Sequence, residues 1–376
     1  MGSRYKASPL ALAALLAVPA TAIMLLAATA TAHAANLTPQ EQKLVDAARK
    51  EGAVTVLNPQ FSDDTGRLLG EGFIKRYNLG PNFKFNNLRK GTGATVAQTR
   101  QEIQAGKHTV DILIVSAPGF FDAAAKRGDF LELDSGYWKN HEEGAKAAGQ
   151  YFKYPYVVVP FAYTFQPMWN TSCPGMANFS AHSYADVLKP ELKGKTIASD
   201  LTKSFTYDNT ALALKEHGVN LADLWKKLKS TDPLIEFRTE PKLQMVLSCQ
   251  RPLDMWNLTG RIHQAALKKP ELLKTIKWGT YKEGQVMLGN QAAVIKGAPH
   301  PNAAKLFMEY MLSKEGTDIM VVGEMMYTFM KDYTPPPEAQ KYLFDTKTTK
   351  MIGLKDWVAA QKQFKGLRAD WQKVFQ

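Results

Sequence analysis

The sequence predicts an α/β protein with largely parallel sheets, and three observations support this. Short β-branched runs such as 54–57 alternate along the chain with helical patterns. The chain has 376 residues, 45% of them hydrophobic and 22% charged, which suits about two globular domains. Beyond the first thirty-odd residues there is no internal repeat or low-complexity tract. This composition disfavours disorder, collagen-like repeats and coiled coil.

Residues 1–34 are expected to be a signal peptide that is removed from the mature protein. Arg4 and Lys6 precede an Ala/Leu-rich run, and Ala32-His33-Ala34 has the small-x-small pattern of a cleavage site. An uncleaved membrane anchor is the alternative, against which Pro19 and the excess of Ala over Leu count. We therefore expect export with cleavage after Ala34.

The net charge is strongly basic. It is +12 for the whole chain, and removing residues 1–34 deletes two cations and no carboxylate, leaving +10. The Lys and Arg residues are scattered, with no block of five or six. This dispersion indicates a solvated basic surface and not a nucleic-acid site.

Two cysteines, Cys173 and Cys249, remain in the exported chain. An even count in an oxidising compartment predicts a disulfide between them. Two unrelated buried thiols are the alternative, because sequence does not define the required geometry.

The expected elements alternate along the chain. Thr38-Pro39-Gln40-Glu41 predicts a capped helix start, and Gly52 predicts its end. Strand patterns then occur at 54–57, 110–115, 195–199 and 285–296. Helical patterns occur at 68–74, 96–105, 120–126, 208–216, 220–228 and 302–312. The stretch 157–169 is too long for one ordinary strand, and Pro160 and Pro167 are expected to break it into shorter pieces. A Pro-rich stretch at 334–337 precedes a helical tail.

Catalytic motifs are absent from the sequence. There is no G-x-S-x-G, H-E-x-x-H or C-x-x-C, and the histidines lack metal-ligand spacing. Gly194-Lys195-Thr196 lacks the glycine that a phosphate loop needs five residues earlier, where Lys189 stands. Gly91-Thr92-Gly93 lacks the third glycine of a dinucleotide fingerprint and is interpreted as a turn. We therefore expect a binding protein with no catalytic residue, no metal and no cofactor.

Four segments carry a family resemblance. The most particular is Gly297-Ala298-Pro299-His300-Pro301-Asn302-Ala303-Ala304-Lys305-Leu306-Phe307, which continues to Ser313-Lys314-Glu315-Gly316. The others are 111–115 with 120–128, Trp169-Asn170-Thr171, and 184–190 with Lys193-Gly194-Lys195. Together they resemble bacterial extracellular solute-binding proteins of the ferric-iron-binding-like type, the receptors of ABC importers.

The resemblance implies a two-lobed, type II periplasmic-binding-protein-like fold with a ligand cleft between the lobes. Lobe one would hold 35–160 and 285–330, lobe two 170–280, and a helical tail 331–376, with packing on lobe two as one option. The resemblance also implies a monomer in the periplasm that binds a small molecule and delivers it to an inner-membrane permease. It implies neither catalysis nor nucleic-acid binding.

Candidate ligand-binding residues follow from the rule that ligands lie beyond the carboxyl ends of strands, near helix N-termini. The rule selects residues after the predicted strands, and the crossing stretch and a second return segment at 253–257 add others. The candidates are Ser62, Asp63, Asp64, Ser116, Ala117, Tyr163, Thr164, Phe165, Asp200, Ser204, Phe205, Trp256, Asn257 and Thr259.

The sequence departs from iron-binding members of the family at one point. Those members carry adjacent tyrosines where this chain has Asn257-Leu258-Thr259-Gly260, and Tyr327 is isolated. The candidates suit a small organic solute, whose carboxylate or phosphate groups, where present, would meet helix N-termini. Ferric iron stays as an alternative ligand. An exported two-lobed hydrolase and a signalling or adhesion module are the alternatives from other classes.

Overall fold

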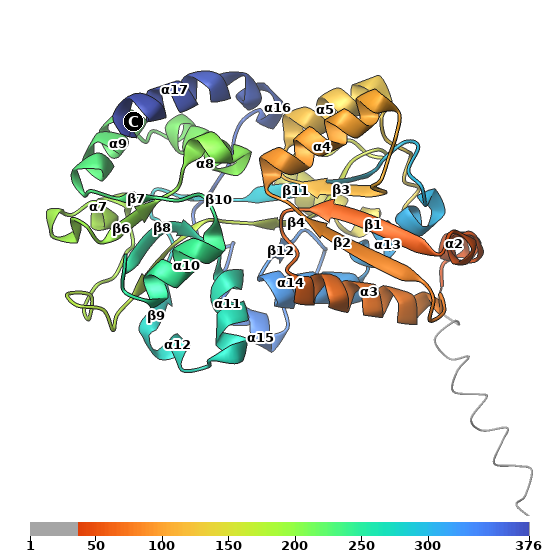
Figure 1. Cartoon of the computed structure of the whole chain (residues 1–376), viewed down its shortest axis with the longest axis horizontal. Coiled ribbons are helices and arrows are strands. Elements are labelled where there is room, and N and C mark those ends of the chain that lie inside the picture. Colours follow the sequence, from red (N-terminus) through yellow and green to blue (C-terminus); the bar gives the residue numbers. More distant parts are fainter. Residues whose placement is uncertain (1–36, 376) are drawn as a thin grey trace, which may run out of the picture. The chain divides into compact units, whose positions relative to one another are not determined.

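Two β-sheets with helices packed against them form the framework of the protein (Figure 1). The computed structural model describes residues 37–375, and the chain from Thr38 onward forms one compact unit. The predicted signal peptide, residues 1–34, lies outside the described residues. Among the described helices, none is long and apolar enough to cross a membrane. We call each sheet with its helices a lobe.

Within residues 37–375, the first sheet has six strands in the order β12-β4-β11-β3-β1-β2. β1 runs parallel to β2 and β3, whereas β11 is antiparallel to β3 and β4. The strands are β1 (Ala53–Asn58), β2 (Lys84–Arg89), β3 (Ile112–Val115), β4 (Val158–Tyr163), β11 (Leu288–Val294) and β12 (Tyr327–Thr328). The helices of this lobe are α2 (Pro39–Glu51), α3 (Asp63–Tyr77), α4 (Thr92–Ala105), α5 (Pro118–Arg127), α6 (Glu142–Ala147), α13 (Pro301–Leu312) and α14 (Lys314–Glu324).

The second sheet has five strands in the described part of the chain, in the order β7-β6-β8-β5-β9. β6 runs parallel to β7 and β8, and β5 is antiparallel to β8 and β9. The strands are β5 (Gln166–Asn170), β6 (Thr196–Ala198), β7 (Leu234–Ile235), β8 (Leu253–Asn257) and β9 (Ile276–Trp278). The helices are α7 (Tyr184–Val187), α8 (Phe205–Glu216), α9 (Leu221–Ser230), α10 (Thr239–Leu247), α11 (Thr259–Lys268) and α12 (Leu272–Thr275). The α/β class agrees with the prediction, but both sheets are mixed and not largely parallel, because β11, β12, β5 and β9 pair antiparallel with their neighbours.

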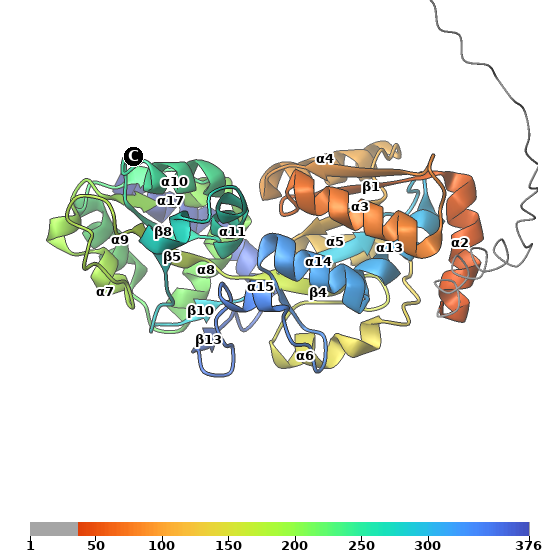
Figure 2. The same cartoon turned by 90° about the horizontal axis from the view of Figure 1, so that it is seen from below.

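The C-terminal segment consists of α15 (Pro337–Gln340), β13 (Met351–Ile352), α16 (Trp357–Ala360) and α17 (Phe364–Phe375). Its last helix packs on the second lobe, whereas α16 lies against α5 of the first lobe. β13 pairs with β10 (Gln285–Val286), and the two lie side by side in Figure 2. Trp371 of α17 packs edge-on against Trp225 of α9, with ring centroids 5.5 Å apart. The Nε of Arg368 donates to Asp208 Oδ2 of α8 at 2.9 Å. The lobe boundaries expected from the resemblance stay a prediction.

The crossing stretch differs from the sequence expectation. The break between β4 and β5 lies at Thr164 and Phe165, and not at the two prolines. Pro160 lies within β4 and Pro167 within β5, each where the strand register shifts. Proline has no N–H to donate to a ladder, and an irregularity in the register leaves a position that needs no donor. The prolines therefore bend these strands without ending them.

Other local signals agree with the structure only in part. Thr38 and Glu41 form a capping box at the start of α2, and Gly52 ends that helix in the left-handed region. Gly91-Thr92-Gly93 was expected to be a turn, but Gly91 is the N-cap of α4 and the next two residues form its first turn. The strand β2 was not predicted, because its sequence KFNNLR is too polar to resemble a buried strand. An edge strand tolerates such a sequence because part of it faces water.

The predicted disulfide is confirmed. Cys173 and Cys249 are bonded, with their Cα atoms 5.5 Å apart. The bond joins the loop after β5 to the residue that follows Ser248, the C-cap of α10. It lies at the edge of the hydrophobic core of the second lobe, where Cys173 is buried.

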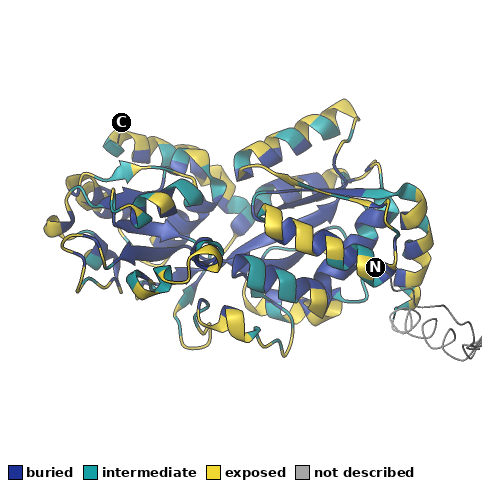
Figure 3. Cartoon of the chain, turned by 60° about the horizontal axis from the view of Figure 1, so that its bottom comes forward, coloured by how far each residue is buried: buried dark blue, intermediate teal, exposed yellow. Residues whose placement is uncertain are grey.

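Each sheet supplies a hydrophobic core. Figure 3 shows the central strands of both sheets as buried and the outer faces of the helices as exposed. In the first lobe Leu113 and Val115 of β3 pack with Phe121 of α5. In the second lobe Leu253 of β8 belongs to a cluster with Trp371 of α17. The apolar runs of the sequence thus form the sheets, and the sheets position the loops that follow the strand ends.

A buried carboxylate in the first lobe predicts a pH-dependent stability. Glu309 of α13 is fully buried, its Oε2 accepts a hydrogen bond from the Gly136 N–H at 3.1 Å, and its Oε1 has no partner among the described residues. Burial raises the pKa of Glu309 from 4.5 to about 7, and the charge of Glu41 acts in the same direction. The folded state therefore favours the protonated form. This stabilisation is complete below pH 4.5 and is lost as the pH rises through 7.

Glu309→Gln, which is neutral at every pH, is expected to be more stable than the wild type at pH 8 by about 2 kcal/mol. At pH 4.5 the two proteins should be nearly equally stable. Denaturant unfolding at both pH values measures the difference, with the exposed Glu338→Gln as the matched control. An unchanged difference between the two pH values would contradict the expectation.

Candidate functional site

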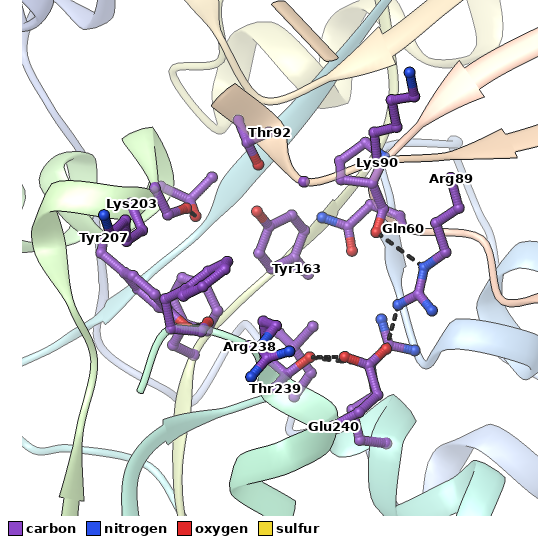
Figure 4. Close-up of a pocket in the computed structure, with 18 residues that line it drawn as sticks. Gln60, Arg89, Lys90, Thr92, Tyr163, Lys203, Tyr207, Arg238, Thr239 and Glu240 are labelled. Carbon is purple, nitrogen blue, oxygen red and sulfur yellow. Dashed lines mark hydrogen bonds and ion pairs between the residues drawn. The ribbon is translucent and has the colours of Figure 1, made fainter. Parts of the chain in front are cut away.

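A cavity of about 390 Å³ lies where loops from both lobes meet, and we call it the interlobe cavity (Figure 4). Its wall consists of residues that follow the carboxyl ends of β1, β2 and β4 in the first lobe and of β6, β7 and β8 in the second. The first lobe provides Pro59, Gln60, Arg89, Lys90, Gly91, Thr92, Tyr163 and, on the crossing stretch, Phe165. The second lobe provides Lys203, Ser204, Thr206, Tyr207, Phe237, Arg238, Thr239, Glu240, Leu258 and Arg261.

Four helices begin at this cavity without a side-chain cap. Their N-caps are Gly91 of α4, Ser204 of α8, Arg238 of α10 and Leu258 of α11, and the side chain of none of these N-cap residues accepts a hydrogen bond from a backbone N–H of the helix that follows. Other helices of the chain are capped, such as α9 by the side chain of Asn220. Free N–H groups and the positive end of the helix dipole favour an anion at such positions.

The cavity is positively charged. Five basic side chains and one carboxylate line it within residues 37–375: Arg89, Lys90, Lys203, Arg238, Arg261 and Glu240. Arg238 is paired with Glu236, which lies outside the cavity, at 3.0 Å between Nη2 and Oε2. In the described structure, neither Lys90 nor Lys203 has an ion-pair partner. Such a wall attracts anions and repels cations.

A chain of ion pairs crosses between the lobes beside the cavity. Arg89 of β2 pairs with Glu240 of α10, and Glu240 Oε1 lies 3.3 Å from Nε of Arg261 in α11. Arg261 Nη1 in turn lies 3.0 Å from Oε2 of Glu324 in α14. Burial acts to raise the pKa of Glu240, but the guanidinium groups of Arg261 and Arg89 outweigh it and lower that pKa to about 2. Glu240 is therefore ionised at every physiological pH.

Aromatic rings form the apolar part of the cavity. The ring centroids of Tyr163 and Phe165 are 5.5 Å apart, and those of Phe165 and Tyr207 are 4.7 Å apart. In Figure 4 Tyr163 lies between the side chains of the two lobes, with Tyr207 on one side and Lys90 on the other. Burial raises the pKa of both phenols, so they are neutral hydrogen-bonding groups.

The structure brings three of the sequence candidates into this cavity: Tyr163, Phe165 and Ser204. Thr164 and Thr259 line a small neighbouring pocket that shares Gln60, Tyr163 and Arg261 with it. Whether any of them contacts ligand stays a prediction.

The other candidates lie elsewhere. Ala117 and Phe205 line a separate pocket against α16, and Ser116 is buried with no partner for its hydroxyl in the described structure. The remaining polar candidates have local roles. Ser62 caps α3, Asp63 and Asp64 lie exposed in its first turn, Asp200 accepts from the Thr202 N–H, Trp256 donates to the Tyr184 hydroxyl, and Asn257 donates to Asp254.

Sequence reasoning missed the charged residues of the cavity. Arg89 ends the strand that was not predicted and Lys90 follows it, directly before Gly91, the N-cap of α4. A basic pair before Gly-Thr-Gly was a usable signal for an anion-binding helix start. Arg238, Glu240 and Arg261 carry no such signal, because they follow two other strands and meet only in space.

No group of three or more His, Cys, Asp or Glu side chains in residues 37–375 could hold a metal ion. Of the two phenols in the cavity, Tyr207 already donates its hydroxyl to the carbonyl of Phe237 at 2.7 Å. The wall is suited to binding a small polar molecule by charge, hydroxyl groups and aromatic faces.

The family model described as bacterial extracellular solute-binding protein matches residues 72–346. No curated protein sequence matches the chain.

Solved structures share the fold at low sequence identity. Iron-bound HitA from Pseudomonas aeruginosa is 17% identical, with a TM-score of 0.66, covering 86% of this chain and 99% of that one. The substrate-binding protein of an ABC transporter from Agrobacterium tumefaciens is 14% identical, with a TM-score of 0.70, covering 86% and 95%. AfuA from Actinobacillus pleuropneumoniae, with fructose-6-phosphate bound, is 16% identical, with a TM-score of 0.64, covering 85% and 99%. At these identities the likeness shows the fold alone.

Proposed function

Because this chain belongs to the bacterial extracellular solute-binding proteins, we propose that it captures a small organic anion in the interlobe cavity and delivers it to the permease of an ABC importer. The family consists of binding receptors, so the chain is not an enzyme. The matched residues 72–346 include almost every residue of the cavity wall.

The charge of the cavity wall carries the proposal. Among the described residues of the wall, five cations face one carboxylate, and that carboxylate is already paired with Arg89 and Arg261. A ligand that neutralises this wall must be negatively charged, since a cation would meet unpaired positive charge. The structure that binds fructose-6-phosphate has the same fold, which makes a phosphorylated or carboxylated organic molecule reasonable.

Hydrogen-bond donors support the same ligand class. Thr92 is 9% exposed, lines the cavity, and its hydroxyl has no partner among the described residues. Together with the free N–H groups at the start of α4, it provides a neutral donor set for an oxyanion. Phe237, with 37% of its surface exposed, offers a ring to the carbon skeleton of the ligand.

The same proposal also includes the location of the protein in the cell. The predicted signal peptide and the extracellular family suit a periplasmic receptor that meets its permease at the inner membrane. Cleavage after Ala34 and a monomeric state belong to this proposal. Binding is expected to close the lobes by bending at the crossing strands β4 and β5.

Native mass spectrometry of the freshly purified protein tests the function, because a receptor with a tight site retains its ligand. We expect a bound organic anion, and isothermal titration with that compound should give one site per chain. Turnover of the compound at substoichiometric protein would instead support the hydrolase alternative and contradict the receptor.

Titration with ferric citrate tests the iron alternative. We expect no tyrosinate-to-iron absorption band, because five cations repel Fe(III) and both cavity phenols have raised pKa values. A saturable band with one iron per chain, abolished by Tyr163→Phe and unaffected by the control Tyr154→Phe at an exposed position, would overturn the organic-anion proposal.

A further inference from the structure

Glu240 stands out among the residues of the cavity because it opposes the charge of the proposed ligand. Its side chain is 45% exposed and lies in the first turn of α10. It bridges Arg89 and Arg261, which belong to different lobes. Its Oε2 also accepts a hydrogen bond from Thr239 Oγ1 at 3.2 Å. A carboxylate that pairs with two arginines in a ligand-binding cavity makes the contacts that an anionic ligand would make.

Arg261 provides an independent sign that a ligand group belongs at this point. The residue is 4% exposed and lines the cavity. Its Nε contacts Thr239 and Glu240, and its Nη1 contacts Gln264 and Glu324. In the part of the chain that the structure describes, Nη2 has no partner. Nη2 is not among the fully enclosed polar atoms of the described residues, so it keeps access to the cavity and can donate to an acceptor of a ligand there.

Arg89 is equally suited to change partner. Its side chain is 33% exposed, and besides Glu240 its guanidinium has one weak contact, from Nε to the carbonyl of Pro59 at 3.4 Å. Because both Arg89 and Glu240 are partly exposed, breaking their pair leaves neither charge buried and costs about 1 kcal/mol or less. Arg261, by contrast, keeps its second carboxylate, Glu324, when Glu240 moves away.

We propose that Glu240 occupies the position of the ligand's anionic group in the ligand-free protein, and that a carboxylate or phosphate displaces it from Arg89 and Arg261. This inference rests on the proposed function. Without ligand, Glu240 would then hold the two arginines in place. Only an anion that binds the two arginines more strongly than Glu240 does would replace it. Weakly charged solutes would be rejected, because they cannot compete with a carboxylate already in contact.

Glu240→Gln tests the proposal. Titration calorimetry would use inorganic phosphate and succinate, two small probes that represent the two anion chemistries. We expect the variant to bind at least one of them about ten-fold more tightly than the wild type, because the internal competitor has lost its charge. Glu71→Gln, a surface change of the same charge in a pair with Arg67, is the matched control and should leave affinity unchanged.

Arg89→Gln distinguishes this role from one in which the ion pair between Arg89 and Glu240 only holds the two lobes together. It breaks the same interlobe ion pair but removes a cation from the ligand's site, so it should weaken anion binding while Glu240→Gln strengthens it. If the pair only held the lobes closed, both variants would weaken binding, and that result would overturn the proposal. Unchanged or weaker binding of both probes by Glu240→Gln would also overturn it. A ligand retained in native mass spectrometry would still support the receptor function in that case, so the two failures are distinguishable.

Discussion

Replacing Lys242 with methionine is expected to lower the free energy of unfolding by about 3–5 kcal/mol. Lys242 of α10 is fully buried, and its ammonium group donates to Ser199 Oγ at 2.9 Å, to Asp254 Oδ1 at 3.1 Å and to the carbonyl of Trp256. Asp254 is also fully buried. Removing the ammonium group leaves the carboxylate of Asp254 without a counter-charge inside the second lobe.

Urea unfolding followed by circular dichroism measures this loss. Lys226→Met, at an exposed position of α9, is the matched control and should change stability by less than about 0.5 kcal/mol. The double variant Lys242→Met/Asp254→Asn should recover part of the loss, since it removes both charges. A loss below about 1 kcal/mol in the single variant would mean that Asp254 is neutral or hydrated in the folded protein.

Arg261→Met is expected to weaken binding of the retained ligand about 100-fold or more. Arg261 is the buried cation of the cavity, and it lies between Glu240 and Glu324. Without it, Glu240 keeps only Arg89 as a counter-charge and Glu324 loses its arginine partner, so the wall attracts an anion less strongly. The free energy of unfolding should also fall, because Glu324 is itself buried.

Calorimetric titration with the ligand found by native mass spectrometry measures the effect. Arg67→Met, on the exposed face of α3, is the control for the loss of one positive charge. Arg261→Lys should recover only part of the affinity, because an ammonium group lacks the planar donors that reach two carboxylates at once. Affinity unchanged in a folded Arg261→Met protein would show that the ligand lies away from this part of the wall.

The cavity wall was only partly predictable. The rule that ligands lie beyond strand ends selected Ser204, the crossing stretch supplied Tyr163 and Phe165, and all three line the cavity. The loop after β3 obeys the same rule in sequence, yet Ser116 is buried away from the cavity and Ala117 lines a different pocket. The rule identifies loops, and only the packing of the two lobes decides which loops face each other.

The basic charge was predicted in amount but not in position. Scattered Lys and Arg residues indicated a solvated surface, whereas five of them line one cavity. Arg89 was missed because the polar edge strand that it ends lacks the hydrophobic pattern of a buried strand. Arg261 was missed because its charge partners, Glu240 and Glu324, come from two other helices, α10 and α14.

The sequence by itself determined the α/β class, the family, the capped start of α2 and the disulfide partners, because these depend on residues close in the chain or on the count of two cysteines. The tertiary structure alone decided that Arg89, Glu240 and Arg261 form one charged wall. Electrostatic energy depends on distance in space, and strands that end together bring together charges that lie far apart in the sequence. In this protein the fold class can therefore be predicted from short segments of the sequence. The class of ligand depends on residues that only the tertiary structure brings together.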